Sequence, residues 1–420
     1  MKLYQHQTNA LEQTKDLNRV AYYLDMGLGK TFVGSEKMKQ LGAKTNLLIC
    51  QKSKVDDWVE HFRKYYEPQI TVFDLTKKNQ IEKMSECRHV CPSIGVINYE
   101  LAWRRPELAK LKDFTLMLDE SSIIQNRKTK QTKFITDKLR PDNVILLSGT
   151  PCSGKYENLW TQAKLLGWDI SEKVYLDHYV NRRLMDLGGV KFWKVLGYKN
   201  VDRLKQKFRD HGAVFLKTEE VLDLPEQTFI DVIVDAPNEY KKFMKNGIVQ
   251  IDSQELIGDT QLTKRLRARQ ICSIYSKAKF EAFKDLLTST NDRLIVFYNF
   301  KAEAEALIKI ANEFDRPWSI ISGDQKVLAA YENYDNSITF VQYQAGSKGL
   351  NLQKANKIVY FSITEKCDDW MQSQKRIHRI GQNRPCFYYI MKCRGTVEER
   401  IHAAVLRGED YTDELFREEE

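Results

Sequence analysis

The residues best suited to chemistry lie together in the stretch Leu24–Thr31, which reads LDMGLGKT. Gly27 and Gly29 let backbone N–H groups approach phosphate oxygens closely, because neither carries a Cβ. Lys30 can place a positive charge on the β- and γ-phosphates, and the Thr31 hydroxyl can complete the coordination shell of Mg²⁺. A leucine stands where the strict phosphate-loop pattern has its first glycine. We still predict a nucleotide site, since the alternative, an ordinary glycine-rich turn, leaves Lys30 unexplained.

An acidic pair, Asp119 and Glu120, follows the apolar run Phe114–Leu118. An aspartate that leaves a buried strand beside a phosphate loop is placed to hold Mg²⁺ through its water shell. The neighbouring glutamate can then polarise a water for attack on the γ-phosphate. The alternative is a solvated acidic turn, and the apolar strand just before the pair favours the catalytic interpretation.

A pair of arginines in the second half of the chain can supply the positive charge that phosphoryl transfer requires. Arg376 and Arg379 lie in Gln372–Gln382, which the sequence predicts to be a helix, so the two would share one face. Guanidinium groups on one face can hold phosphoryl oxygens bidentately and offset transition-state charge, the role of an arginine finger. A salt-bridged surface helix is the alternative. The glycine-rich turn Ala345–Leu352 offers spare N–H donors to a phosphodiester backbone.

Apolar runs of strand length alternate with helical stretches, and this alternation must position the residues above. In the first half the runs are Val20–Leu24, Asn46–Cys50, Ile94–Ile97, Phe114–Leu118 and Val144–Leu147. In the second half they are Phe229–Val234, Arg293–Tyr298, Trp318–Ile321, Ile338–Val341 and Ile358–Phe361. The pattern predicts two doubly wound, mostly parallel α/β sheets, of which only the first has a phosphate loop. Such sheets bind ligands at polar residues that follow the carboxyl ends of their strands.

Three stretches lie outside this alternation. Lys155–Phe215 is predicted to be a helical insertion on the first sheet, and its aromatic and basic residues suit a nucleic-acid backbone, with packing plus solvated lysines as the alternative. Asn238–Ile274 is predicted to be helical and is rich in lysine and arginine. Leu3–Gln7 opens a helix ahead of the phosphate loop. The amide of Gln7 either reaches an adenine edge or lies on the surface of that helix.

Length and composition fit a soluble protein of two domains. A chain of 420 residues is too long for one core, and we place the domains at 1–225 and 226–420. No run approaches the ~18 apolar residues of a membrane span, and the first residues lack the apolar segment of a signal peptide. Cys87–Cys91, with His89 between, and Cys386–Cys393 invite a zinc interpretation but lack its paired spacing. The formal net charge of +9 permits an anionic polymer as a partner.

Taken in order, these pieces resemble the Swi/Snf-related ATPases of helicase superfamily two, in particular small members of phage or bacterial type. The matching stretches run from Leu3 to about Ile401 and read DMGLGKT, LDESS, LLSGTP, FLKTEEVLDLP, RLIVFYNF, QAGSKGLNL, QSQKRIHRIGQ and RGTVEERI. The RIHRIGQ stretch, followed by GTVEERI, is the most specific part. The resemblance implies two RecA-like lobes, with ATP in the cleft between them and DNA across both.

The resemblance also implies roles for individual residues. Those expected to act in catalysis are Lys30, Asp119, Glu120, Arg376 and Arg379. Those expected to bind ATP are Gln7, Met26, Gly27, Leu28, Gly29, Lys30, Thr31, Gly349 and Gln372. Mg²⁺ is expected on Thr31 and Asp119, through water. The expected coupling residues are Ser122, Ser148, Gly149 and Thr150. The expected DNA contacts are Lys52, Ser53, Asn98, Tyr99, Asn299, Ser347 and Lys348.

Two positions depart from the family pattern. The family usually has Asp-Glu-Ala-His where this chain has Asp-Glu-Ser-Ser, so Ser122 replaces the histidine that couples hydrolysis to motion. The hydrolytic pair itself is intact, and the change therefore bears on coupling to DNA. Gln51 stands where a proline is usual, in a loop that contacts the nucleic-acid backbone.

We therefore expect a DNA-stimulated ATPase that uses ATP and Mg²⁺ to move along duplex DNA. One alternative is a strand-separating or branch-migrating helicase of phage replication or recombination, which needs a wedge that Trp193 or the Lys155–Phe215 insertion would supply. Another is a non-hydrolysing ATP-gated DNA clamp, against which Glu120 and both arginines argue. We expect a monomer in the cytoplasm, that of the bacterial host if the chain is phage-encoded. It would bind double-stranded or branched DNA and no membrane, with phage replication or recombination proteins as partners.

Overall fold

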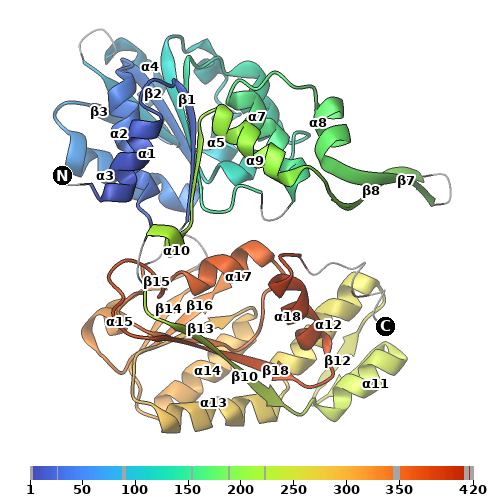
Figure 1. Ribbon diagram of the computed structural model, residues 1–420. Helices are drawn as coiled ribbons and strands as arrows, with labels where there is room; N and C mark the ends of the chain where they lie inside the picture. Colours follow the sequence, from blue (N-terminus) through green and yellow to red (C-terminus); the bar gives the residue numbers. More distant parts are fainter. Residues whose placement is uncertain are drawn as a thin grey trace. The chain divides into compact units, whose positions relative to one another are not determined.

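In the computed structural model the chain folds into two compact units, Met1–Leu222 (unit 1) and Asp223–Glu420 (unit 2). Each unit is an α/β fold with helices on both faces of a mainly parallel sheet (Figure 1). This confirms the predicted fold class. The structure describes residues 3–25, 27–87, 91–152, 155–187, 190–221, 224–343, 351–410 and 416.

Unit 1 is built on a parallel sheet with the strand order β3-β4-β2-β5-β6-β1-β9. The strands are β1 (Arg19–Leu24), β2 (Thr45–Cys50), β3 (Thr71–Asp74), β4 (Ser93–Asn98), β5 (Phe114–Asp119), β6 (Asn143–Ser148) and β9 (Ala213–Leu216). The helices are α1 (Gln5–Gln13), α2 (Lys30–Leu41), α3 (Val55–Tyr66), α4 (Gln80–Cys87), α5 (Tyr99–Ala102), α6 (Lys130–Lys133), α7 (Trp160–Leu165), α8 (Glu172–Tyr179), α9 (Val201–Asp210) and α10 (Thr218–Val221).

Both faces of this sheet are covered, and the side chains of each strand alternate between them. Val20 and Tyr22 join the core formed with α1, α2 and α3, whereas Ala21 and Tyr23 join the core formed with α7, α8 and α9. A strand buried on both faces reads as a continuous apolar run. For this reason the inner strands of this sheet, β4, β2, β5, β6 and β1, could be recognised in the sequence.

The stretch Lys155–Phe215 is only partly helical, which corrects the predicted helical insertion. Between α8 and α9 it forms an antiparallel hairpin of β7 (Val180–Leu187) and β8 (Val190–Tyr198). Its last residues begin β9, which pairs with β1 at the edge of the main sheet. β-branched and aromatic residues, such as Phe192, Trp193 and Val195, favour the strand conformation of β8.

Unit 2 is built on a second sheet with the order β10-β18-β17-β13-β16-β14-β15, parallel except for β15. The strands are β10 (Gln227–Val234), β13 (Leu294–Tyr298), β14 (Trp318–Ile321), β15 (Lys326–Val327), β16 (Ile338–Gln342), β17 (Lys357–Tyr360) and β18 (Cys386–Cys393). The helices are α11 (Asn238–Asn246), α12 (Gln261–Ser273), α13 (Lys277–Ser289), α14 (Lys301–Glu313), α15 (Ala329–Asn333), α17 (Cys367–Gln374) and α18 (Val397–Leu406). In neither unit is any described helix both long and apolar enough to cross a membrane.

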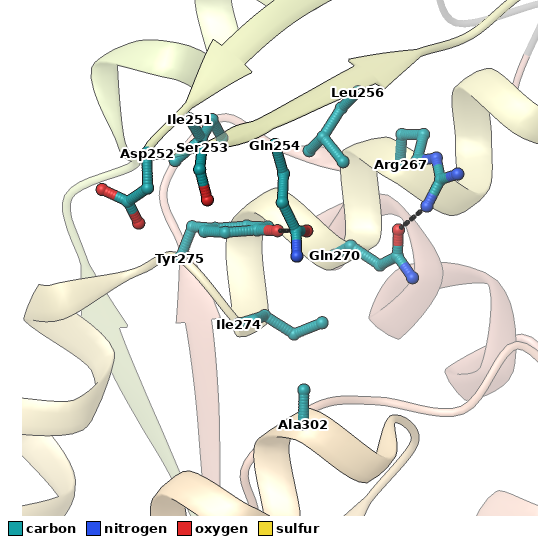
Figure 2. A pocket seen from close by; sticks show the side chains of 10 residues that line it. All are labelled: Ile251, Asp252, Ser253, Gln254, Leu256, Arg267, Gln270, Ile274, Tyr275 and Ala302. Atoms are coloured by element: carbon teal, nitrogen blue, oxygen red, sulfur yellow. Dashed lines mark hydrogen bonds between the residues drawn. The ribbon is translucent and has the colours of Figure 1, made fainter.

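The stretch Asn238–Ile274 is also not continuously helical. A hairpin of β11 (Ile248–Ile251) and β12 (Gln254–Ile257) separates α11 from α12. Figure 2 shows a cavity of about 430 Å³ beside this hairpin, with the Tyr275 hydroxyl donating to Gln254 Oε1 at 2.8 Å on one side. None of the predicted site residues that the structure describes lines this cavity.

His61 of α3 gives unit 1 a pH-dependent stability. Its ring packs among the rings of Phe32, Trp58 and Tyr65, and Nε2 lies 3.0 Å from Ser35 Oγ. Burial lowers the pKa of His61 from 6.5 to about 4. Between pH 6.5 and about 4, His61 is therefore protonated in the unfolded chain but neutral in the folded chain. The free energy of unfolding consequently falls as the pH drops from 6.5 towards 4.

We expect His61→Phe to flatten this dependence, measured as the thermal unfolding midpoint of the full chain between pH 7.5 and 4.5. The exposed His178 of α8 provides the control, His178→Gln, which should keep the full dependence. Part of the dependence should remain in His61→Phe, because burial also lowers the pKa of His402 in unit 2 to about 4. An unchanged pH profile in His61→Phe would contradict the assignment.

Candidate nucleotide-binding site

The predicted phosphate loop connects β1 to α2, so it has the strand and the helix N-terminus that the sequence predicted on either side. Gly27 (φ 90°) and Gly29 (φ 76°) both adopt the left-handed conformation that favours glycine. A Cβ on Gly29 would lie 2.1 Å from Gln7 Nε2, so any other residue would strain the backbone and also displace the Gln7 amide. The N-terminus of α2, which starts at Lys30, presents the positive end of the helix dipole to the loop.

Gln7 holds the loop from the side of α1. Its Nε2 donates to the Leu28 carbonyl oxygen at 3.1 Å, and its Oε1 accepts from Tyr4 N at 2.9 Å. The side chain is therefore buried against the loop and does not lie on the helix surface. Its role towards adenine stays a prediction, and such a contact would require the amide to exchange these partners.

Lys30 and Asp119 bring opposite charges together at the loop. Lys30 Nζ donates to the backbone oxygens of Leu24 at 2.8 Å and Asp25 at 3.3 Å. Asp119 ends β5, and its Oδ2 accepts from Trp58 Nε1 at 2.8 Å. Burial raises the pKa of Asp119, while the Trp58 bond and the charge of Lys30 favour its ionised form. A carboxylate beside a loop of N–H donors fits a Mg²⁺–nucleotide, whose cation would further favour ionisation.

Glu120 adopts a left-handed conformation, with φ 53° and ψ 59°. Residues other than glycine rarely take this conformation, and it is concentrated at functional sites. The turn is held on its N-terminal side by the Tyr99 hydroxyl, which donates to the Asp119 carbonyl oxygen at 2.9 Å. On its C-terminal side Ile123 N donates to the Glu120 carbonyl oxygen at 3.0 Å. The backbone thus fixes the predicted catalytic pair at the carboxyl end of β5.

Gln162 of α7, which the sequence analysis missed, joins three segments around this pair. Its Oε1 accepts from the Ser121 hydroxyl at 2.8 Å and from the Tyr23 hydroxyl at 2.9 Å. Its Nε2 donates to the Pro151 carbonyl oxygen at 2.8 Å. The side chain is completely buried. It therefore connects the strand before the phosphate loop, the residue after Glu120 and the SGTP turn.

Gln162→Leu is expected to lower the free energy of unfolding by about 1–3 kcal/mol, because it leaves buried hydroxyls without an acceptor. Adding Tyr23→Phe and Ser121→Ala to that variant removes those hydroxyls and should restore part of the loss. Urea unfolding of the full chain measures both. If the triple variant is no more stable than Gln162→Leu alone, the hydrogen bonds do not carry the effect.

The predicted coupling residues lie at the ends of β5 and β6. Ser148 is buried and accepts from Thr150 N at 3.2 Å. Thr150 Oγ1 is buried and has no hydrogen-bond partner among the residues that the structure describes. Ser122 and Gly149 are half-buried. Their coupling role stays a prediction, and Gln162 now supplies a physical link between Ser121 and the SGTP turn.

Thr218 is a second residue that the sequence analysis missed. It follows β9 in the FLKTEE stretch, and both its N–H and its hydroxyl donate to Asp25 Oδ2, at 3.1 and 3.2 Å. Asp25 N in turn donates to the Leu216 carbonyl oxygen at 3.0 Å. The matched stretch after the insertion therefore fixes the start of the phosphate loop.

In unit 2 the predicted helix over Gln372–Gln382 is wrong from Lys375 onward, because α17 ends at Gln374. Backbone carbonyl oxygens after Gln374 accept hydrogen bonds from donors outside the predicted helical pattern. Leu352 N donates to the Arg376 oxygen at 3.1 Å, and Gln382 Nε2 donates to the Ile377 oxygen at 3.3 Å. Arg376 and Arg379 are therefore held in a turn.

The two arginines differ in exposure. Arg376 is only 2% exposed, whereas Arg379 is half-buried, and burial lowers the pKa of Arg379. Arg379 Nε has no hydrogen-bond partner within the described part of the chain, and neither has Oε1 of the buried Gln372. The arginine-finger role and the ATP contact of Gln372 stay predictions.

The predicted DNA contacts that the structure describes differ in their exposure to solvent. Lys52 and Ser53 lie exposed in a short helical turn after β2, where they are accessible to phosphate. Tyr99 is 1% exposed and supports the Asp119 turn, and Asn98 is also buried, which differs from the predicted contacts. Asn299 Nδ2 donates to Ser362 Oγ at 2.9 Å, so it ties β13 to β17. The predicted DNA contacts Ser347 and Lys348 and the predicted ATP contacts Met26 and Gly349 lie outside the described residues.

Comparison with known proteins places these features in a family. The SNF2-related domain matches residues 23–273, and the helicase conserved C-terminal domain matches residues 278–381. A solved structure, the Sulfolobus solfataricus SWI2/SNF2 ATPase core in complex with dsDNA, covers 97% of this chain and 91% of its own, with a TM-score of 0.47 and 19% identity.

Curated relatives match over most of this chain. The putative ATP-dependent helicase/translocase YwqA of Bacillus subtilis is 22% identical over 94% of the chain and 46% of its own length. The DNA annealing helicase and endonuclease ZRANB3 of Homo sapiens is 23% identical over 89% of the chain and 36% of its own length. The chain thus spans less than half the length of these relatives. With the SNF2-related match over more than half of its residues, the chain belongs to the SNF2-related family of helicase-type ATPases.

Proposed function

We propose that the chain is a DNA-stimulated ATPase that uses ATP with Mg²⁺ to translocate along duplex DNA. The observation that carries this proposal is the convergence of Lys30, Asp119 and the strained Glu120 at the phosphate loop. Family membership supports it, as do relatives named as an ATP-dependent helicase/translocase and as a DNA annealing helicase.

Each step would use groups of this chain. The N–H groups around Gly27 and Gly29 and the Lys30 ammonium would bind the phosphates. Thr31 and Asp119 would hold Mg²⁺, which would neutralise charge on the phosphate oxygens. Glu120 would orient the attacking water, and Arg379 of unit 2 would complete the site when the units close. Reopening after hydrolysis would then advance one unit along the DNA backbone.

The decisive experiment compares phosphate release with blunt duplex, single-stranded and forked DNA, using Lys30→Ala as the inactive control. We expect duplex DNA to accelerate hydrolysis, an effect that weakens with salt because phosphate contacts dominate binding. Hydrolysis by Lys30→Ala at the wild-type rate would overturn the assignment of unit 1. ATP binding without phosphate release would instead favour the ATP-gated clamp.

Movement is tested separately, by displacement of a triplex-forming strand from duplex DNA. Stimulated hydrolysis without displacement would retain the ATPase and reject the translocase. The monomeric state, the cytoplasmic location and a source in phage replication or recombination stay predictions. Sedimentation of the purified chain with and without DNA tests the first of these.

A further inference from the structure

The β7–β8 hairpin is the part of unit 1 that the proposed motor does not use. Its strands pair only with each other in the described structure, and Figure 1 shows the hairpin extending away from the body of unit 1 beyond α8. A two-stranded hairpin on its own is only marginally stable in water. A hairpin that extends in this way therefore needs either firm anchoring or a partner.

The base of the hairpin is firmly anchored. The Tyr198 hydroxyl donates to Glu157 Oε2 at 2.7 Å, and the Tyr198 ring packs edge-on against Tyr156 with centroids 5.1 Å apart. Lys199 N donates to the Tyr179 carbonyl oxygen at 3.0 Å, and Tyr179 lies in the core of unit 1. The hairpin is thus held rigidly at its base, where it leaves the core.

The hairpin carries exposed apolar side chains along its length. Trp193 is 55% exposed, and the other exposed apolar side chains of the hairpin are Leu184, Phe192, Val195 and Leu196. A cluster of exposed apolar residues on one projecting element indicates a binding surface. Trp193 stands opposite Leu184 on one face, and the next pair, Met185 and Phe192, must face the other way.

Basic side chains lie between these apolar residues. The described hairpin carries one acidic residue, Asp186, and four basic residues: Arg182, Arg183, Lys191 and Lys194. The Arg182 guanidinium lies 4.6 Å from the centroid of the Trp193 ring, and its Nη2 donates to Asp177 at 2.8 Å. This stacked pair fixes the indole and keeps a cation beside it.

We propose that the hairpin binds unpaired bases at the junction between duplex and single-stranded DNA, with Trp193 stacking on a base. The proposal rests on the proposed function above. Basic residues outnumber acidic ones four to one on the described hairpin, and this net positive charge favours an anionic partner such as DNA. Inside a duplex both faces of each base are covered by its neighbours, so an exposed indole can stack on an unpaired base but not on a base within the duplex. The substrate class would then be forked or otherwise branched DNA.

The test measures the Kd for forked, single-stranded and blunt duplex DNA by fluorescence anisotropy, without nucleotide and at one salt concentration. We expect Trp193→Ala to raise the Kd for forked and single-stranded DNA about tenfold and the Kd for blunt duplex less than about twofold. Trp193→Phe, which keeps an aromatic face, should recover most of the loss. The matched control is Trp318→Ala, which removes a 37%-exposed tryptophan of β14 and should change no Kd. Circular dichroism checks the fold of each variant.

A second measurement tests directly whether a DNA base lies against the hairpin. Irradiation of a forked oligonucleotide that carries 5-iodouracil in one arm should cross-link to the hairpin peptide of the wild type, and the yield should fall in Trp193→Ala. Equal losses on blunt duplex and fork would overturn the junction assignment, as would unchanged binding in Trp193→Ala. A change in sedimentation coefficient alone would make the hairpin a self-association surface. These measurements of binding do not depend on ATP hydrolysis. If DNA failed to stimulate hydrolysis by the wild type, the proposed function would be rejected, but the hairpin test could still be carried out.

Discussion

Glu120→Gln is expected to bind ATP with near wild-type affinity while its rate of hydrolysis falls by about 100-fold or more. Glutamine has the same shape and keeps the turn, but it cannot accept a proton from the attacking water. The variant should therefore accumulate with ATP bound. ATP affinity measured by titration and phosphate release measured in a single turnover separate the two effects.

Asp113→Asn is the matched control for Glu120→Gln. Asp113 precedes β5, the strand that Glu120 follows, and it has the same left-handed φ of 53° but is exposed. Its amide variant should hydrolyse ATP normally. Loss of ATP binding in Glu120→Gln would show that Glu120 acts as a metal or structural ligand, because only a residue needed for binding would have that effect.

The parts of the site that the sequence predicted are those set by local pattern. A buried strand shows as an apolar run, and the residue that ends it stands at the carboxyl edge of a parallel sheet. This was enough to predict the positions of Lys30 and of Asp119. The edge strand β9 was missed, because it is only four residues long and lies inside a stretch rich in aromatic and basic residues.

The parts that the sequence did not predict depend on contacts between distant segments. Gln162 lies in a short helix, where a lone glutamine resembles a surface residue, and only the folded chain brings Tyr23, Ser121 and Pro151 to it. The end of α17 is a similar case. The spacing of Arg376 and Arg379, which follow α17, suits a helix. In the fold, however, the Arg376 carbonyl oxygen accepts a hydrogen bond from Leu352 N and not from a later residue of a continued helix. No local pattern records either contact.

Of the two arginines in this turn, Arg379 offers the clearer test of whether unit 2 supplies an arginine finger. Arg376 is 2% exposed, so its replacement would disturb packing as well as charge. Arg379 is half-buried, and its guanidinium has an Nε without a hydrogen-bond partner in the described residues, so an approaching phosphate would give it one. If it acts as an arginine finger, Arg379→Ala should lower the maximal hydrolysis rate about 10³- to 10⁵-fold.

The affinity for ATP should change far less than that rate, because the finger would engage only when the units close. DNA should still bind with its usual salt dependence, yet it should no longer accelerate hydrolysis. Arg384→Ala is the control: this exposed arginine lies a few residues away, donates to the Lys354 carbonyl oxygen at 2.8 Å, and should cost at most about tenfold in rate. Arg379→Lys keeps the charge but loses the planar fork, so its rate should fall between Arg379→Ala and wild type. If DNA still stimulates Arg379→Ala fully, unit 2 does not complete the ATP site, and DNA must promote hydrolysis through unit 1 alone.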